Sequence, residues 1–166
     1  MQTRNVWLWA LLPALALAAG NAPASSSAGE AAAPATVKIN FGKDAIKPTP
    51  AQTAAIRRAA AEDIKEFNHP EQGGYAVALA DLNDDGRSGL LVQYDDMAFC
   101  GSSGCSGVIV LATPHGYAGE GIGLPNFTTL AVLSAVHHGM HDLQYNGNSP
   151  IWKWNGKEYD VPGSMP

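Results

Sequence analysis

The sequence predicts a mainly β protein with one helix at the N-terminal end of its fold. This is an α+β chain whose strands form an antiparallel sandwich or a small propeller-like sheet array. Three observations support that class. A helical apolar pattern occurs once, over residues 50–67. From residue 73 onward, short apolar segments alternate with turns rich in Asn and Gly. The length of 166 residues, with only two cysteines, fits one globular domain rather than a disulfide-held miniprotein.

Capping and stop signals delimit the expected helix. Thr49 can cap its N-terminus, Pro50 suits the first helical position, and Gln52 stands where a capping box requires it. The sequence Asn-His-Pro at 68–70 ends the helix, because the residue before a proline avoids the helical conformation. Four apolar residues share one face: Ile56, Ala60, Ile64 and Phe67. We therefore expect a structural helix that covers a sheet.

Alternation of apolar and polar residues predicts the strands. The first is expected at 37–41, before the helix. The later ones are expected at 75–80, 90–94, 107–112, 127–136, 141–146, 150–154 and 158–161. The pair Asn155-Gly156, between the last two, is typical of a two-residue hairpin turn.

The first 24 residues have the order of a cleaved secretory signal peptide. Arg4 precedes fourteen uncharged, mostly apolar residues at 6–19, and A-x-A sites lie at 16–18 and 22–24. Fourteen residues are short for a membrane span, which needs roughly 20. An uncleaved N-terminal anchor is the alternative. We expect a periplasmic or secreted protein with no membrane span after processing.

Residues 25–35 are expected to form a flexible leader, because Ser, Ala, Gly and Pro dominate them and bury too little surface to fold. The single β-rich domain is then expected over 36–166. Cleavage after Ala24 removes Arg4, which leaves nine basic and 15 acidic residues and changes the net charge from −5 to −6. A chain this acidic has no basic surface for nucleic acid, which we exclude as a partner.

The segment DLNDDG at 81–86 matches the first half of a calcium-binding loop. Asp81, Asn83 and Asp85 would supply side-chain oxygens, and Arg87 would supply its backbone carbonyl. The closing acid is missing, because Val92 stands at that position, and the flanking segments read as strands. We expect calcium to bind weakly, at about 10⁻⁴ to 10⁻³ M. The alternative is a polar turn that binds nothing.

Cys100 and Cys105 enclose the short sequence GSSG. In an exported chain two such thiols are expected to pair, and closing so small a loop stabilises by roughly 2 kcal/mol. The alternatives are a metal pair or a redox site. A rigid, exposed tip of this kind could occupy the cleft of another protein. The residues expected to contact that partner are Tyr94, Asp95, Asp96, Ser102 and Ser103.

Three histidines cluster at His137, His138 and His141. Imidazoles are common zinc ligands, so a small hydrolase or zinc protein is one hypothesis. The segment reads as strand, turn and strand, however, so His137 and His138 point to opposite faces. The sequence contains no HExxH or G-x-S-x-G motif. We therefore expect surface or edge histidines and a chain that is not an enzyme.

Four segments taken together resemble a known group of proteins. They are YAVALADLNDDG, FCGSSGC, HDL and WKWNGKEY, and the resemblance spans residues 73–160. The chain resembles bacterial periplasmic proteins in which an Asp-rich strand–loop–strand precedes a CGxxGC hairpin. Some members of that group are similar to periplasmic lysozyme inhibitors and to immunity proteins against secreted peptidoglycan hydrolases. The resemblance implies a small β-rich domain that blocks a cell-wall hydrolase.

The main hypothesis is therefore an exported, non-enzymatic inhibitor or immunity-like protein. Lysozyme-like and other peptidoglycan hydrolases are often basic, and an acidic binder would be steered toward them. One alternative is a calcium-stabilised structural or adhesive module centred on residues 81–86. The other is the small hydrolase or zinc protein that would use the histidines.

Overall fold

The computed structural model describes three stretches of the chain: 36–66, 74–147 and 149–163. Every described residue belongs to one compact unit. The expected signal peptide (1–24), leader (25–35) and helix stop (68–70) lie outside the described residues. Within those three stretches, no helix is both long and apolar enough to cross a membrane.

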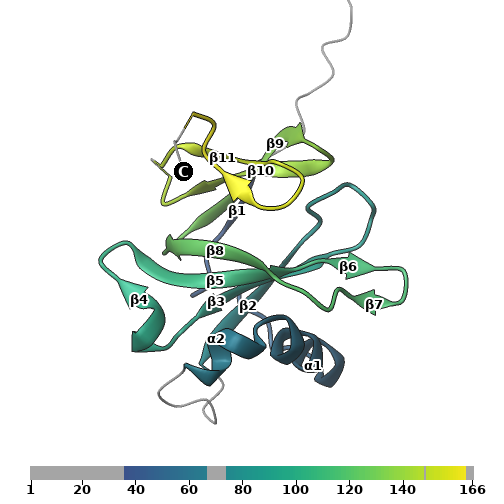
Figure 1. The fold of residues 1–166 in the computed structure, drawn as a ribbon, viewed down its shortest axis with the longest axis vertical. Helices are drawn as coiled ribbons and strands as arrows, with labels where there is room; N and C mark the ends of the chain where they lie inside the picture. The colour runs from purple at the N-terminus through teal and green to yellow at the C-terminus, as the bar shows by residue number, and fades with distance from the viewer. Residues whose placement is uncertain (1–35, 67–73, 148, 164–166) are drawn as a thin grey trace, which may run out of the picture. The chain divides into compact units, whose positions relative to one another are not determined.

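Two antiparallel sheets stack on each other, and helices cover the outer face of one of them (Figure 1). The first sheet has the order β1 (Val37–Ile39), β9 (Leu130–His137), β10 (Met140–Tyr145), β11 (Ile151–Trp154) and β12 (Tyr159–Asp160). The second has the order β2 (Tyr75–Ala80), β3 (Gly89–Tyr94), β5 (Gly104–Val110) and β8 (Ile122–Phe127). The mainly β class expected from the sequence is confirmed, as a sandwich with a helix layer.

Three further strands are short, and only one of them belongs to the second sheet. β4 (Cys100–Gly101) pairs with the start of β5. β6 (Ala112–Thr113) and β7 (Gly116–Tyr117) form a separate two-stranded ladder after β5.

The core lies on both sides of the second sheet, because its central strands are apolar at successive positions. On β3, Leu91 faces the first sheet, whereas Leu90 and Val92 face the helices. β5 repeats this arrangement, with Ile109 toward the first sheet and Val108 toward the helices. Both strands are therefore fixed from two sides, which gives the segment that follows each of them a rigid base.

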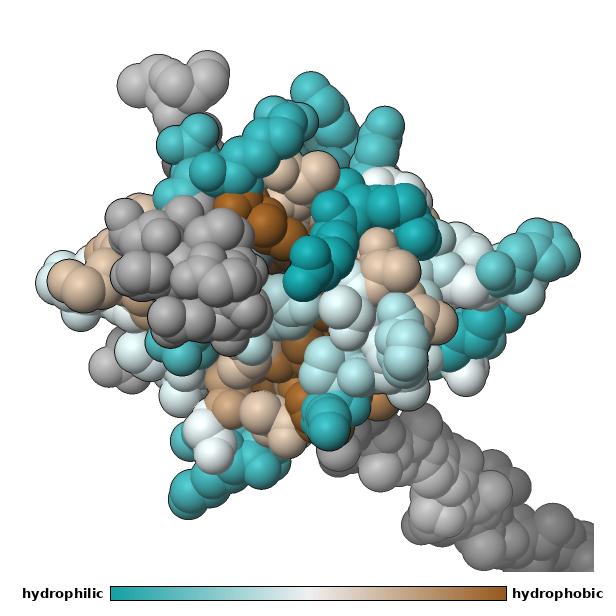
Figure 2. All heavy atoms as spheres, turned by 90° about the horizontal axis from the view of Figure 1, so that it is seen from below, coloured by the Kyte–Doolittle hydropathy of each residue, from teal (hydrophilic) through white to brown (hydrophobic). Residues whose placement is uncertain are grey.

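The helix layer begins as the sequence predicts. α1 (Pro50–Ala59) starts with a capping box, in which Thr49 Oγ1 accepts from the Gln52 amide and Gln52 Oε1 accepts from the Thr49 amide. Ile56 is fully buried against the sheet. On the helix side, hydrophobic residues show between the polar ones (Figure 2).

The single helix expected over 50–67 is broken at Ala60. Its backbone leaves the helical region, with φ −111° and ψ 25°, and α2 (Ala61–Lys65) follows. Asp63 on α2 accepts a hydrogen bond from the Tyr94 hydroxyl on β3. This bond fixes α2 to the sheet separately from α1, a long-range contact that apolar spacing does not report.

The strand expected over 127–136 is instead two strands in different sheets. β8 ends at Phe127 and β9 begins at Leu130. Between them the chain crosses from one sheet to the other, and Asn146 Oδ1 accepts from the amides of Thr128 and Thr129. Neither of the two residues at this crossing, 128 and 129, is a Gly or Pro that would indicate a strand end in the sequence.

The two-residue hairpin turn occurs at a different place from the one expected. His138 and Gly139 both have positive φ, 48° and 80°, and join β9 to β10 with His137 opposite Met140. The turn at Asn155 has four residues, 155–158, because Asn155 Oδ1 accepts from the amides of residues 157 and 158 and widens the loop.

Candidate functional site

A disulfide closes the hairpin at one end of the second sheet. Cys100 and Cys105 are joined with an S–S distance of 2.05 Å and are direct cross-strand partners on β4 and β5. The predicted disulfide is thus confirmed. A short 3-10 helix, η2 (Met97–Phe99), immediately precedes β4. We call residues 97–105 the cysteine tip.

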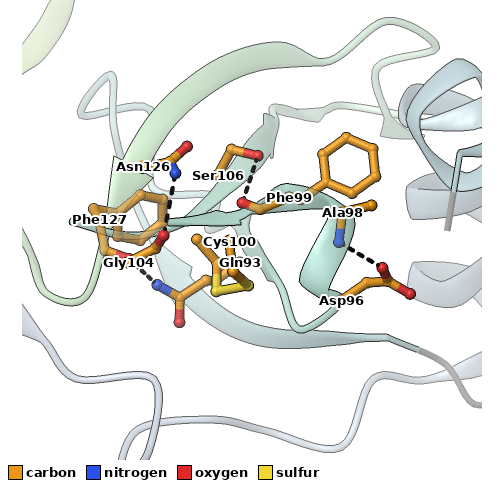
Figure 3. Close-up of a disulfide and its surroundings, with 10 residues drawn as sticks. Gln93, Asp96, Ala98, Phe99, Cys100, Gly104, Ser106, Asn126 and Phe127 are labelled. Atoms are coloured by element: carbon orange, nitrogen blue, oxygen red, sulfur yellow. Dashed lines mark hydrogen bonds between the residues drawn. A yellow bond between two sulfur atoms is a disulfide. The ribbon is translucent and has the colours of Figure 1, made fainter. Parts of the chain in front are cut away.

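Side chains from other elements anchor the cysteine tip (Figure 3). Asn126 on β8 donates to the carbonyl of Gly104 at 3.2 Å, as Figure 3 shows. Asn146 donates to the carbonyl of Ser103 at 3.0 Å. Gly104 has φ 110°, and a Cβ there would stand 2.2 Å from the carbonyl oxygen of Phe127. The hairpin is therefore packed closely against the neighbouring strand and has little freedom to move.

The residues expected to contact a partner divide into two groups. Asp95, Ser102 and Ser103 are exposed. Tyr94 and Asp96 lie in the interior, 2% and 7% exposed. Their side chains are therefore placed to support the cysteine tip rather than to face a partner.

Each of the two interior side chains has a structural contact. Burial, and then the hydrogen bond to Asp63, raise the pKa of Tyr94 well above its ordinary value. Asp96 Oδ1 accepts from the amide of Ala98 and caps η2 (Figure 3).

Met97 is a surface residue that the sequence analysis missed. It is 89% exposed, more than any other large apolar side chain among the described residues. Its position follows from Asp96, which caps η2 and makes Met97 the first residue of the 3-10 helix. The exposure of Met97 could have been predicted from the sequence, because Met97 is a single apolar residue that follows a possible cap residue and lies outside any strand pattern.

The acidic loop, residues 81–88, lies at the opposite end of the sheet from the cysteine tip. The register of β2 and β3 shows this, since Tyr75 pairs with Tyr94 at one end and Ala80 with Gly89 at the other. The expected calcium loop and the expected partner site are therefore separate places on the molecule.

The side chains of the acidic loop are largely engaged by the loop itself. The Asp81 carboxylate accepts from the amides of Asn83 and Gly86, at 3.2 and 2.8 Å. Asp85 accepts from the amide of Arg87 at 2.8 Å and from its guanidinium at 2.7 Å. Desolvation raises the pKa of Asp85. The hydrogen bonds with Arg87 and Asn83 and the charge of Arg87 lower it by more, so the pKa of Asp85 lies below its ordinary value.

The three histidines lie in three different environments. His137 Nδ1 lies 2.6 Å from Asp142 Oδ1, and His141 Nε2 lies 2.9 Å from Asp84 Oδ1. His138 is part of the turn between β9 and β10. Among the described residues, no group of three or more His, Cys, Asp or Glu side chains is arranged to hold a metal ion.

Two histidine contacts join parts of the chain that are distant in sequence. Asp84 and His141 link the acidic loop to β10 of the first sheet, and the His141 amide also donates to the Leu82 carbonyl. Lys153 on β11 lies 3.2 Å from His137 Nε2, which completes a row of Asp142, imidazole and ammonium. Sequence reasoning missed both contacts because neither is local.

Comparison with models of protein families, with curated proteins and with solved structures finds no match for this chain. The resemblance to periplasmic inhibitors and immunity proteins therefore stays a prediction. A functional proposal rests on the geometry of the described residues and on charge.

Proposed function

We propose that this chain is an exported, non-enzymatic binding protein that inserts its cysteine tip into the cleft of a secreted cell-wall hydrolase. The observation that carries the proposal is the tip itself, which is exposed at residues 100–103 yet closed by a disulfide and anchored by Asn126 and Asn146. A loop that is already ordered loses little conformational entropy on binding, so more of its contact energy appears as affinity.

The surface around the tip suits an enzyme cleft. Met97 offers an apolar side chain that a cleft can bury, and Ser102 and Ser103 offer polar groups beside it. Asp95 adds an exposed acid next to the tip. The net charge, −5 for the whole sequence and −6 after the expected cleavage, would steer the protein toward a basic partner, and lysozyme-like and other peptidoglycan hydrolases are often basic.

The proposal is tested by mixing the purified protein with a panel of lysozymes and amidases and measuring wall hydrolysis. We expect stoichiometric inhibition of at least one enzyme, with an inhibition constant that Met97→Asp raises at least tenfold. The exposed residue Ile151, on β11 of the first sheet, provides the control, because Ile151→Asp also replaces an exposed apolar side chain with an acid but does so outside the tip. The proposal fails if no enzyme of the panel is bound or slowed.

A second candidate function is a calcium-stabilised structural or adhesive module. The observation that favours it is the 2.8 Å hydrogen bond from the Gly86 amide to Asp81 Oδ2, which folds the loop back onto the first of the expected ligands. Because Arg87 already partners Asp85, binding would be weak. Melting curves with calcium and with a chelator test it: the difference between them should vanish in Asp81→Ala. Identical curves for the unmodified protein would eliminate this candidate.

A further inference from the structure

Met97 places a thioether sulfur at the surface of the cysteine tip. Its side chain is 89% exposed, whereas Met140, the other methionine of the described residues, is 5% exposed and belongs to the core. The other large apolar side chains exposed in this part of the chain are Val, Leu and Ile, hydrocarbons that mild oxidants do not attack. Both cysteines are already joined in the disulfide. The accessible reduced sulfur of the described residues is therefore that of Met97.

The local structure around η2 keeps Met97 on the outside. Asp96 Oδ1 accepts from the amide of Ala98 at 2.9 Å, and the Asp96 carbonyl accepts from the amide of Phe99 at 2.9 Å (Figure 3). The Phe99 ring meets the Tyr94 ring edge to face, with 5.0 Å between their centroids, which anchors the end of η2 on β3. The short helix is thus fixed by its cap and by Phe99, and a change in the polarity of Met97 does not disturb its packing.

An exposed methionine sulfur reacts with two-electron oxidants such as hydrogen peroxide. The sulfur attacks one oxygen of the peroxide, and the S–O bond forms as the O–O bond breaks. The second oxygen takes the proton of the first and leaves as water, so the sulfur loses two electrons and the peroxide gains them. The product, methionine sulfoxide, is polar, and two reductases, one for each epimer at sulfur, restore the thioether.

We propose that Met97 is an oxidation site that regulates binding by the cysteine tip. This inference rests on the proposed function, because it takes Met97 as the apolar group that a hydrolase cleft buries. In that cleft the sulfoxide oxygen would lose its hydrogen bonds with water, and burying a polar group without a partner is unfavourable. Oxidation therefore weakens inhibition and reduction restores it, while the fold stays unchanged.

The first experiment needs no target enzyme. The purified protein is treated with hydrogen peroxide, and peptide mass spectrometry follows the gain of one oxygen at each methionine over time. We expect Met97 to react at least about tenfold faster than Met140 in the folded protein, and the two to react at equal rates once denaturant exposes both. Equal rates in the folded protein would overturn the proposal, as would a melting curve that moves when Met97 alone has reacted.

The second experiment uses a hydrolase that the unmodified protein inhibits. Oxidation of Met97 should raise the inhibition constant at least about tenfold, and treatment with both methionine sulfoxide reductases should return it to its starting value. An inhibition constant that peroxide leaves unchanged, or that the reductases do not restore, would count against the proposal decisively.

Met97→Leu is the matched control, because leucine has a similar volume and no sulfur. Whatever the inhibition constant of this variant, peroxide should leave it where it was. An equal change in the variant and the unmodified protein would assign the effect to another residue and overturn the proposal. If no enzyme of the panel is bound, the proposed function fails and this inference with it, whereas selective oxidation of Met97 without loss of inhibition overturns this inference alone.

Discussion

Gly107 stands where β5 passes β3 without room for a side chain. A Cβ at this position would lie 2.0 Å from the carbonyl oxygen of Val92. We predict that Gly107→Ala lowers the free energy of unfolding by about 1–3 kcal/mol, the cost of forcing extra volume into a packed core. Gly123 on β8 is the matched control, because a Cβ there meets no atom within 4 Å and the change should stay within about 0.5 kcal/mol. Urea denaturation measures both, and equal losses would contradict the prediction.

The pair of His137 and Asp142 is the second prediction at the residue scale. Asp142 is 2% exposed, and a buried carboxylate is costly unless it is paired. His137→Ala removes its hydrogen bond and should lower the free energy of unfolding by about 1–3 kcal/mol. His115→Ala, at an exposed position before β7, should have little effect. If the thermal melts of the two variants coincide, the pair of His137 and Asp142 contributes nothing to the stability of the fold.

At the scale of elements, local signals determined what the sequence could predict. The start of α1 was predictable because Thr49 and Gln52 form their capping box within one turn of helix. The division of 127–136 into β8 and β9 was not, because the crossing depends on Asn146, which lies 17 residues after Thr129 in the sequence. The break at Ala60 likewise has no local signal.

The disulfide between β4 and β5 makes a contribution to the free energy of unfolding that can be measured. Replacing both cysteines, in Cys100→Ser/Cys105→Ser, should lower the free energy of unfolding by about 2 kcal/mol, because the unfolded chain regains the freedom of a short loop. The core of the sheet should stay folded, since β3 and β5 are buried on both faces. Chemical denaturation measures the loss, and adding a reductant to the unmodified protein should reproduce it. A variant as stable as the unmodified protein would contradict this account.

At the scale of the whole molecule, the candidate sites show the same limit. Cys100 and Cys105 could be paired from the sequence because they are neighbours along the chain and across the hairpin. The hydrogen bond of Tyr94 reaches Asp63 on α2, and the acidic loop contacts the first sheet through His141, 57 residues after Asp84. Such contacts are set by the packing of both sheets and the helices, which local patterns do not specify.

Three buried tyrosines make the stability of the whole fold sensitive to alkaline pH. Burial raises the pKa of Tyr94, Tyr145 and Tyr159 well above the ordinary value, and a nearby charge from Asp63, Tyr159 or Asp142, respectively, adds to this. In the unfolded chain these phenols ionise near pH 10. The folded state keeps its protons to higher pH, so this contribution is complete below about pH 10 and is lost as the pH rises above it.

We therefore predict that tyrosinate absorbance from these three side chains rises together with the loss of near-ultraviolet circular dichroism, at a pH well above 10. Tyr145→Phe tests the linkage. Its hydroxyl is buried without a hydrogen-bond partner among the described residues, so phenylalanine should cost nothing near neutral pH. Because the variant has one fewer group to ionise on unfolding, its alkaline transition should move to higher pH. Ionisation of all five tyrosines while the circular dichroism stays intact would show instead that hydroxide reaches these side chains in the folded state.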